Sequence, residues 1–421
     1  MRSFSLVAGS VLALIAAVPA TAATPAEAVA TYSDMAEATY GDSLAAAETL
    51  HAAIEAFLAA PSPEGLATAK QAWIAARAPY QQTEVFRFGN PVVDDWEGKV
   101  NSWPLDEGLI DYVDVSYGGA TDENELAALN VIGNPEITIS GQTVDASVIT
   151  PALISDTLDQ ADGVESNVAR GYHAIEFLLW GQDLNGHAPG AGNRAWTDYA
   201  ARADCTNGNC DRRADYLRAA SQLLVDDLGW MTKQWADGGA ARAAVAQDLE
   251  LGLGAMLKGM GSLSYGELAG ERMRLGLMLN DPEEEQDCFS DNTHNSHYYD
   301  ALGIQNVYLG RYLRIDGTTV AGPSLQDLVA DADPALDAEI AAKLGASVAA
   351  LGAIKAAAEG GMAYDTMLEA GNSEGEQLIS AGVDALVDQT RSFERAITAL
   401  GLDDIAFEGS DSLDSPDAVF Q

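Results

Sequence analysis

One stretch of the chain places an imidazole and a carboxylate at a spacing that suits metal binding. If residues 171–183 form a helix, His173 and Glu176 lie one turn apart on the same face. Neighbouring imidazole and carboxylate groups can share one divalent cation. Two residues at this spacing also recur by chance, so a buried structural His–Glu pair is an equally good interpretation of the pattern alone.

The surrounding residues make the pattern more specific. The order G-x-H-x-x-E, followed by an apolar run and Trp-Gly-Gln-Asp at 180–183, resembles the signature of the imelysin family, in particular its iron-regulated periplasmic or outer-membrane members. Residues 75–84, 101–111 and 289–294 agree with this resemblance. The resemblance implies an exported, all-helical protein of two bundle-like halves that takes part in iron uptake. The founding members of the family are described as metallopeptidases.

A cation site needs about four to six donor atoms, so further ligands must come from elsewhere. Asp291 and His294 share a polar turn ahead of a predicted helix, where helix capping is an alternative role and both roles can hold at once. Glu84 lies among apolar residues and needs a partner, for which a metal or Arg77 would each serve. Asp106 is a further candidate carboxylate. We expect these groups to meet in a cleft between the two halves and to bind iron, with zinc or another divalent cation as alternatives.

The residues themselves argue against a peptidase. The H-E-x-x-H pattern is absent. The inverted pattern H-x-x-E-H needs a second histidine after Glu176, where Phe177 stands. Peptidase activity therefore depends on the family resemblance alone, and a metal-binding protein without catalysis is the preferred prediction.

Two other classes of protein remain as alternatives. A ferritin-like di-iron enzyme needs two E-x-x-H pairs, whereas this chain has one pair in the reverse order. A module that binds haem, a siderophore or a peptide would use aromatic side chains near the cleft, for which Trp73, Trp96, Trp103 and Trp180 are candidates. Ordinary core packing is the preferred explanation of these tryptophans.

The elements that would position these residues are predicted to be helices. Apolar residues recur at helical spacing between clusters of Pro and Gly, which gives an all-α fold class with two short hairpins, near 136–144 and 315–320. The region from 89 to 150 reads as largely irregular. We expect a first helical domain over 24–237, a second over 238–405 and a flexible tail over 406–421. The predicted helices cover 24–60, 63–88, 151–159, 166–180, 211–235, 240–260, 263–279, 294–313, 334–359 and 373–400.

Composition and the N-terminus predict the compartment. The 421 residues include 22 Lys and Arg against 64 Asp and Glu, a net charge of −42 that disfavours nucleic acid and anionic lipid as partners. Residues 1–23 resemble a secretory signal peptide, with a basic start, an apolar run over 4–18 and small residues at 20–22. No cysteine stands directly after that run, so a lipoprotein anchor is not expected. No later stretch reaches the roughly 20 apolar residues of a membrane span. A periplasmic or secreted protein is expected, with envelope iron-uptake components as partners.

The three cysteines suit an oxidising compartment. Cys205 and Cys210 flank a turn-rich loop that can close as a local disulfide, which leaves Cys288 unpaired.

Overall fold

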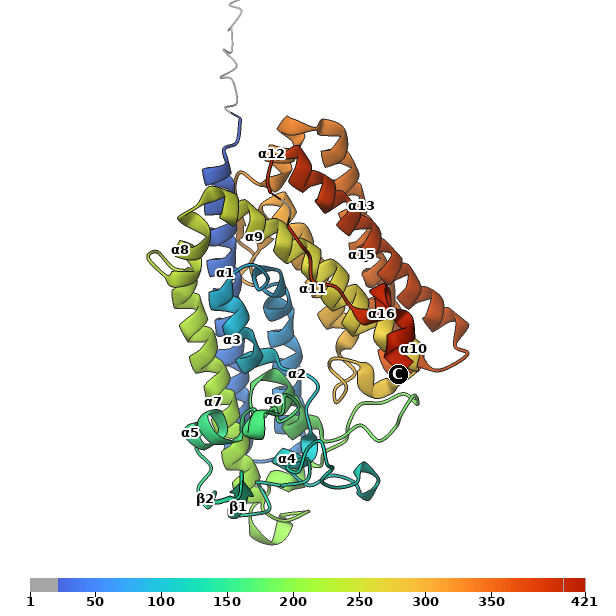
Figure 1. Cartoon of the computed structure of the whole chain (residues 1–421). Coiled ribbons are helices and arrows are strands. Elements are labelled where there is room, and N and C mark those ends of the chain that lie inside the picture. The colour runs from blue at the N-terminus through green and yellow to red at the C-terminus, as the bar shows by residue number, and fades with distance from the viewer. Residues whose placement is uncertain (1–21, 404, 421) are drawn as a thin grey trace, which may run out of the picture.

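The computed structural model describes residues 22–403 and 405–420, and the chain is built almost entirely from helices (Figure 1). Helices account for 66% of it and strands for 4%, so the predicted all-α class is confirmed. Most of the predicted signal peptide, up to residue 21, lies outside the described residues. The helices up to residue 237 are α1 (Pro25–Ala59), α2 (Pro63–Gln81), η1 (Glu84–Phe86), α3 (Pro91–Asn101), α4 (Glu107–Ile110), α5 (Pro151–Leu153), α6 (Gly171–Trp180) and α7 (Cys210–Trp235), together with the short turns η2 (Val115–Tyr117), η3 (Ile154–Leu158), η4 (Ala161–Gly163), η5 (Trp196–Tyr199) and η6 (Arg202–Asp204).

The later helices begin after the break at residues 236–239. The segment between α9 and α10 is a π-helix, η7 (Leu263–Arg274). The others are α8 (Ala240–Ala246), α9 (Leu249–Ser262), α10 (Leu275–Leu279), η8 (Pro282–Glu284), α11 (Thr293–Leu309), α12 (Leu325–Ala332), α13 (Pro334–Glu359), α14 (Tyr364–Leu368), α15 (Ser373–Ala399) and α16 (Asp411–Asp414).

The first helices pack around α1. Thr24 and Glu27 form a capping box, in which each side chain accepts a backbone N–H at the start of the helix, so α1 begins where the sequence predicts. Helix α1 packs against both α2 and α7, and Figure 1 shows α1 and α7 side by side. Helix α6 packs between α2 and α7, which places the His–Glu stretch inside this group of helices.

The later helices form a second group, joined to the first. Helix α13 packs against α11 and α15, and α15 packs against η7 (Figure 1). Helix α11 also packs against α2, while α9 contacts both α1 and α15. The two groups therefore share long contacts, and the segment before α11 is brought against α2 and α6.

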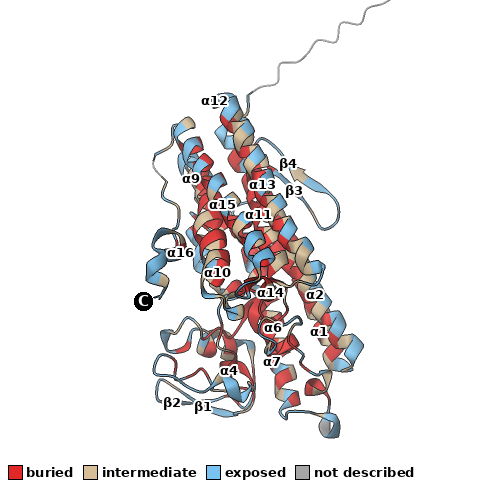
Figure 2. Cartoon of the chain, turned by 90° about the vertical axis from the view of Figure 1, so that its right-hand side faces the viewer, coloured by how far each residue is buried: buried red, intermediate tan, exposed pale blue. Residues whose placement is uncertain are grey.

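One large hydrophobic cluster runs through both groups. It includes Tyr32 of α1, Leu178 of α6, Ile340 of α13 and Phe393 of α15. A smaller cluster lies between η7, α13, α14 and α15. Figure 2 shows the buried residues concentrated on the facing sides of helices from both groups. The apolar core is thus continuous across the predicted domain boundary at residue 237.

Two regions are more ordered than their sequences predict. The predicted irregular region contains α3, because Pro91 begins this helix rather than ending the one before it, and Asn90 caps it. Towards the C-terminus, residues 405–414 of the predicted tail lie against α9 and η7. There Ser412 donates a hydrogen bond to the Gly270 carbonyl, and Glu408 pairs with Lys258 at 2.8 Å.

Both hairpins are present. Strand β1 (Glu136–Ile139) pairs antiparallel with β2 (Gln142–Asp145), and the turn lies at residues 140–141, as predicted. Strand β3 (Arg311–Leu313) pairs with β4 (Thr319–Ala321), so most of the predicted range 315–320 forms the turn of this second hairpin.

Helix α13 is long and apolar enough to cross a membrane by length and composition alone, with a mean hydropathy of 1.4 in its most apolar window. Only 28% of that window is buried. One such helix is weak evidence for a membrane span, and α13 packs against α11 and α15 along the body of the protein.

The start of α7 is tied to the rest of the fold by covalent and ionic links. Cys205 and Cys210 form a disulfide, whereas Cys288 is a free, buried thiol. Just beyond the disulfide, the Arg213 guanidinium donates to both oxygens of Asp111, at 2.6 and 3.0 Å. Arg194 donates to the same carboxylate at 2.7 Å. All three charged groups are buried, so Asp111 is a counter-charge to both guanidinium groups, and Asp198 is a second one at 3.4 Å from Arg194.

We predict that Asp111→Asn destabilises the fold by about 3–5 kcal/mol, because it leaves buried positive charge uncompensated. Burial raises the pKa of Asp111, but Arg194 and Arg213 outweigh that effect and hold the pKa below its usual value. The pKa of Asp111 in the unfolded chain is about 4. The difference in unfolding free energy between the native protein and the variant should therefore be largest above about pH 4 and decrease as the pH falls below that value. Urea unfolding at several pH values measures it. Asp122→Asn, at an exposed position, is the control, and a loss below about 1 kcal/mol for Asp111→Asn would contradict the prediction.

Candidate metal centre

The backbone before the His–Glu pair requires glycine. Gly171 begins α6 with φ +82°, and a Cβ at this position would lie 2.5 Å from the carbonyl oxygen of Val100. Only glycine fits such a conformation at so close an approach. Every residue of α6 is buried, so the helix passes through the core with all its side chains packed. This explains the first position of G-x-H-x-x-E as a packing requirement.

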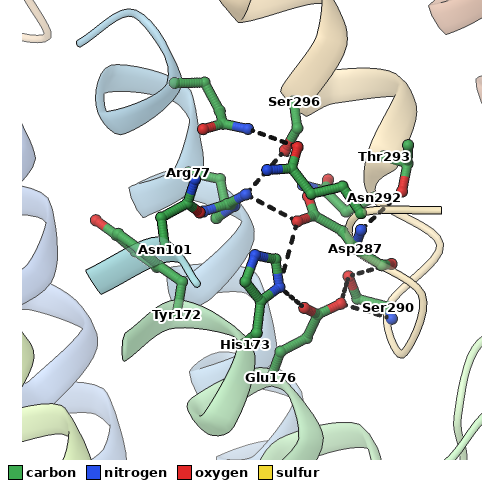
Figure 3. A network of polar contacts seen from close by, with 12 residues as sticks. Arg77, Asn101, Tyr172, His173, Glu176, Asp287, Ser290, Asn292, Thr293 and Ser296 are labelled. Atoms are coloured by element: carbon green, nitrogen blue, oxygen red, sulfur yellow. Dashed lines mark hydrogen bonds and ion pairs between the residues drawn. The ribbon is translucent and has the colours of Figure 1, made fainter. Parts of the chain in front are cut away.

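The two side chains of the pair meet, and a third group joins them (Figure 3). The Nδ1 atom of His173 lies 3.0 Å from Oε2 of Glu176 and 3.8 Å from Oδ1 of Asp287. One possible ligand atom from each of the three residues lies within 4.8 Å of the others. Their side chains are 1%, 0% and 0% exposed. A nitrogen and two carboxylates from α6 and from the segment before α11 thus converge in the core.

Hydrogen bonds fix both carboxylates in place. The backbone N–H and hydroxyl of Ser290 both donate to Oε1 of Glu176, at 3.0 and 2.6 Å, which leaves Oε2 facing the histidine. Asp287 accepts hydrogen bonds from Asn292 and from Ser296, a residue of α11. Hydrogen bonds from the groups of the candidate centre therefore hold the segment 287–296 against α6.

Arg77 of α2 supplies the nearest positive charge. Its guanidinium donates to Oδ1 of Asp287 at 2.9 Å and to Asn101 at 2.7 Å, and it is completely buried. The aromatic rings of Trp73, Tyr80 and Tyr172 surround it at 5.0 to 5.7 Å, within the range of cation–π contacts. The charge is thus held in a fixed place where it compensates Asp287.

The protonation states follow from burial. Burial lowers the pKa of His173 to about 3, with Arg77 adding to the effect, so the imidazole is neutral at physiological pH. Burial, and next the charge of Asp287, raises the pKa of Glu176 well above its usual value. Burial acts on Asp287 in the same direction, but Arg77 outweighs it and keeps that pKa low. With both Glu176 and Asp287 ionised, the group would carry two negative charges. Only Arg77 would balance them, because His173 is neutral, so the group is one positive charge short.

These donor atoms fit a transition-metal ion. Ligands at about 2.1 Å from an ion lie about 3.0 to 3.4 Å from their neighbours, close to the 3.0 and 3.8 Å separations from His173 Nδ1. A hydrogen-bonded His–Glu pair would explain the shorter distance alone. The Arg77 ion pair holds Asp287 in the same buried place, so a third ligand atom is available beside the His–Glu pair. The donor set of one imidazole and two carboxylates suits iron or zinc.

The comparisons with known proteins identify the family. The family model described as Imelysin matches residues 36–393, most of the chain. This protein belongs to the imelysin family. Among curated proteins, iron-regulated protein A of Synechococcus elongatus is 38% identical over 66 residues, 15% of this chain and 18% of that protein. The match thus spans less than a fifth of that relative's length.

Two solved structures resemble the fold. A protein from Parabacteroides distasonis, assigned as an iron-regulated protein A precursor, has a TM-score of 0.64 at 20% identity, over 89% of this chain and 95% of its own. An imelysin-like protein from Psychrobacter arcticum has a TM-score of 0.55 at 14% identity, over 92% of this chain and 100% of its own. At these identities the likeness establishes the imelysin fold and nothing beyond it.

Two of the predicted ligands lie elsewhere in this imelysin fold. Glu84, in η1, pairs at 2.8 Å with Arg272 of η7, not with a metal group or with Arg77. Asp106 precedes α4 and accepts hydrogen bonds from Tyr117 at 2.9 Å and from Ser166 at 2.6 Å. Both carboxylates therefore have protein partners outside the His173 group.

The other two predicted ligands lie nearer but also outside the group. Asp291 belongs to a separate set of acidic side chains with Glu285 and Asp365. The ring of His294 contacts the Asn295 amide at 3.0 Å, and burial, together with the charge of Lys355, lowers its pKa to about 4. Helix α11 begins after Asn292 with no side-chain cap, so Asp291 does not have the capping role that was its alternative.

The sequence interpretation missed Asp287 because it ends an acidic run, 281–287, that reads as a solvated loop. In the structure Asp287 is buried, as are Glu285 and Gln286. The neighbouring stretch 289–294, which contributes to the family resemblance, is the signal that pointed to this segment. The predicted cleft is not open either, since His173 and Glu176 are closed to solvent.

Away from this centre, we predict that the metal-free imelysin loses stability as the pH rises from 6.5 to 8. Burial, followed by the charge of Glu84, raises the pKa of Glu97 to about 7, so the folded protein binds a proton there that the unfolded chain has released. Folding stability falls with pH wherever the folded state holds more protons. Glu97→Gln should remove about 1 kcal/mol of that fall, measured by urea unfolding at both pH values. Glu123→Gln, at an exposed site, is the control, and an unchanged slope in Glu97→Gln would refute the prediction.

Proposed function

We propose that this imelysin binds iron, or an iron-bearing ligand, outside the cytoplasm as part of iron acquisition. The observation that carries the proposal is the meeting of His173, Glu176 and Asp287 in one buried group that is a positive charge short. A bound cation would supply that charge. Binding the ion is then favourable because it removes the cost of an uncompensated carboxylate in the core.

Each residue has a distinct part in this proposal. His173 would provide a neutral imidazole nitrogen, and Glu176 and Asp287 would provide hard oxygen ligands. Ser290 would hold Glu176 so that Oε2 faces the ion, and Arg77 would orient Asp287. Three protein ligands leave further positions for water or for groups of an incoming iron-bearing molecule.

The choice of iron over zinc draws on the relatives. The name of the curated relative from Synechococcus elongatus describes it as iron-regulated, and the match to it covers a small part of each chain. The donor set accepts either metal, so the identity of the ion is the part of the proposal that most needs measurement.

Location outside the cytoplasm is part of the same proposal. The sequence of residues 1–23 predicts export, and the disulfide between Cys205 and Cys210 suits an oxidising compartment. Envelope proteins of iron uptake are the corresponding partners. Nucleic acid is not expected as a partner, because the net charge is −42.

Iron binding is tested by titrating the metal-free protein with Fe²⁺ without oxygen, in a calorimeter. The native protein should bind one equivalent at the candidate centre. The double variant His173→Ala, Glu176→Ala should bind Fe²⁺ at least about 100-fold more weakly. Replacing a residue that only hydrogen-bonds a metal ligand typically weakens metal affinity by roughly 10- to 100-fold. Glu176→Gln keeps the shape and one oxygen to accept from Ser290 while removing the charge, so its binding should also fall.

The matched control is His294→Ala, which removes a nearby, partly buried imidazole outside the group. Its affinity should equal that of the native protein. Binding by the double variant within about twofold of the native value would exclude this centre, provided that circular dichroism shows an unchanged helical fold.

A peptidase would use the same metal differently, and we expect none of that activity. A peptide carbonyl has to reach the ion, whereas the three side chains are closed to solvent, and no second histidine follows Glu176. Incubation of the pure protein with a fluorogenic peptide library and Zn²⁺ should give no cleavage above that of the double variant. Metal-dependent turnover by the native protein alone would overturn this expectation.

A further inference from the structure

A second set of acidic side chains lies close to the segment that holds Asp287. Glu285, Asp291 and Asp365 each offer a carboxylate oxygen, and these three atoms lie within 4.8 Å of one another. Glu285 and Asp291 come from the segment before α11, and Asp365 comes from the first turn of α14. Glu285 and Asp365 are each 1% exposed, whereas Asp291 is partly exposed.

Each of these carboxylates has one oxygen without a hydrogen-bond partner, although Thr366 donates to Oδ1 of Asp365 at 3.5 Å. Oε2 of Glu285, Oδ1 of Asp291 and Oδ2 of Asp365 are buried atoms with no hydrogen-bond partner. Among the described residues, no lysine or arginine lies within ion-pair distance of any of the three. Elsewhere in the core the guanidinium groups of Arg77, Arg213 and Arg272 each contact a carboxylate directly. Three converging carboxylates without a cation are therefore exceptional within this fold.

We propose that Glu285, Asp291 and Asp365 form a second cation site, made only of oxygen ligands, that takes a calcium-like divalent ion. The observations that carry it are the convergence of three carboxylate oxygens and the buried oxygen without a hydrogen-bond partner on each of the three side chains. It goes beyond the iron-binding function proposed above, because it uses different residues and a different class of ion.

The ligand chemistry selects the class of ion. Carboxylate oxygens without nitrogen or sulfur favour hard cations, and Ca²⁺ takes oxygen ligands at about 2.3 to 2.6 Å in flexible geometry. Oxygens up to about twice that distance apart can bind the same Ca²⁺, which agrees with the spread of the three oxygens. Mg²⁺ holds its ligands at about 2.1 Å in a stricter octahedron and usually retains several waters, so it suits a nearly dry site less well.

The position of the site gives it a structural consequence. His187, from the loop after α6, contacts the backbone carbonyl of Asp365 at 2.8 Å, and Thr366 donates to the His187 carbonyl at 3.0 Å. The site therefore lies where that loop, the segment before α11 and the start of α14 come together. A bound cation would cross-link the segment that carries Asp287 to α14, next to the candidate metal centre.

The test is thermal unfolding of the metal-free protein with and without CaCl₂, together with Tb³⁺ luminescence. At roughly 100 times the Kd, Ca²⁺ should raise the Tm of the native protein by about 3–5 °C. Tb³⁺, which replaces Ca²⁺, should emit on excitation of tyrosine, because the buried Tyr364 is adjacent to Asp365. Asp365→Asn and Glu285→Gln should abolish both signals without lowering the Tm measured in the absence of metal, since each removes uncompensated negative charge.

Two further variants make the result decisive. Glu369→Gln, which changes an exposed carboxylate one turn beyond Asp365, should keep the full response. The His173→Ala, Glu176→Ala variant should also keep it, whether or not the native protein binds iron, so the two proposals fail separately. The inference is overturned if Ca²⁺ and Tb³⁺ give no response in the native protein. It is equally overturned if the response survives in Asp365→Asn, or if it is lost only in the His173→Ala, Glu176→Ala variant.

Discussion

The buried ion pair between Arg77 and Asp287 is the constraint on which the centre of this molecule depends. It joins α2, in the first group of helices, to the segment that precedes α11 in the second. Aromatic rings from α2 and α6 enclose the guanidinium, and Asn101 accepts its remaining strong hydrogen bond. With Asp287 held in this way, Ser290 reaches Glu176, and the His–Glu pair acquires its acidic neighbour. Removing either charge would leave the other one buried without a partner, a more serious defect than the loss of one contact.

Charge in the interior of this protein follows two opposite patterns. In one pattern, basic and acidic groups are matched, as where Arg194 and Arg213 meet Asp111 and Asp198 at 2.6 to 3.4 Å. In the other, acidic groups converge with too little positive charge nearby, as at Glu176 and at Glu285 with Asp365. The first pattern stabilises the joined helices. The second has a cost in folding free energy, and it occurs at the places where we propose that cations bind.

Much of the fold could be predicted from the sequence, because helices are local. Apolar spacing and caps such as Thr24 with Glu27 predict α1, and Ser-Gly at 140–141 predicts the first hairpin. Helix α3 was missed because Pro91 has the same appearance at the start of a helix as after the end of one.

The His–Glu pair could be found because both residues lie on one helix turn. Asp287 could not, since its approach to His173 depends on a tertiary ion pair, and an acidic run gives no local sign of burial. For Glu84 the need for a partner was predictable, whereas the identity of that partner, Arg272, was a matter of helix packing.

The continuous hydrophobic core has a consequence for how anything reaches the interior. Many ligand-binding proteins of two lobes open by rigid-body rotation about a hinge between separate cores. Here one apolar cluster extends from α1 to α15, so swinging the lobes apart would expose packed side chains at about 25 cal/mol for each Å². Helices with that much shared surface are expected to stay together. Access would instead come from local unfolding of the short stretch between η8 and α11, where the backbone N–H groups of Asp287 and Ser290 donate to side chains.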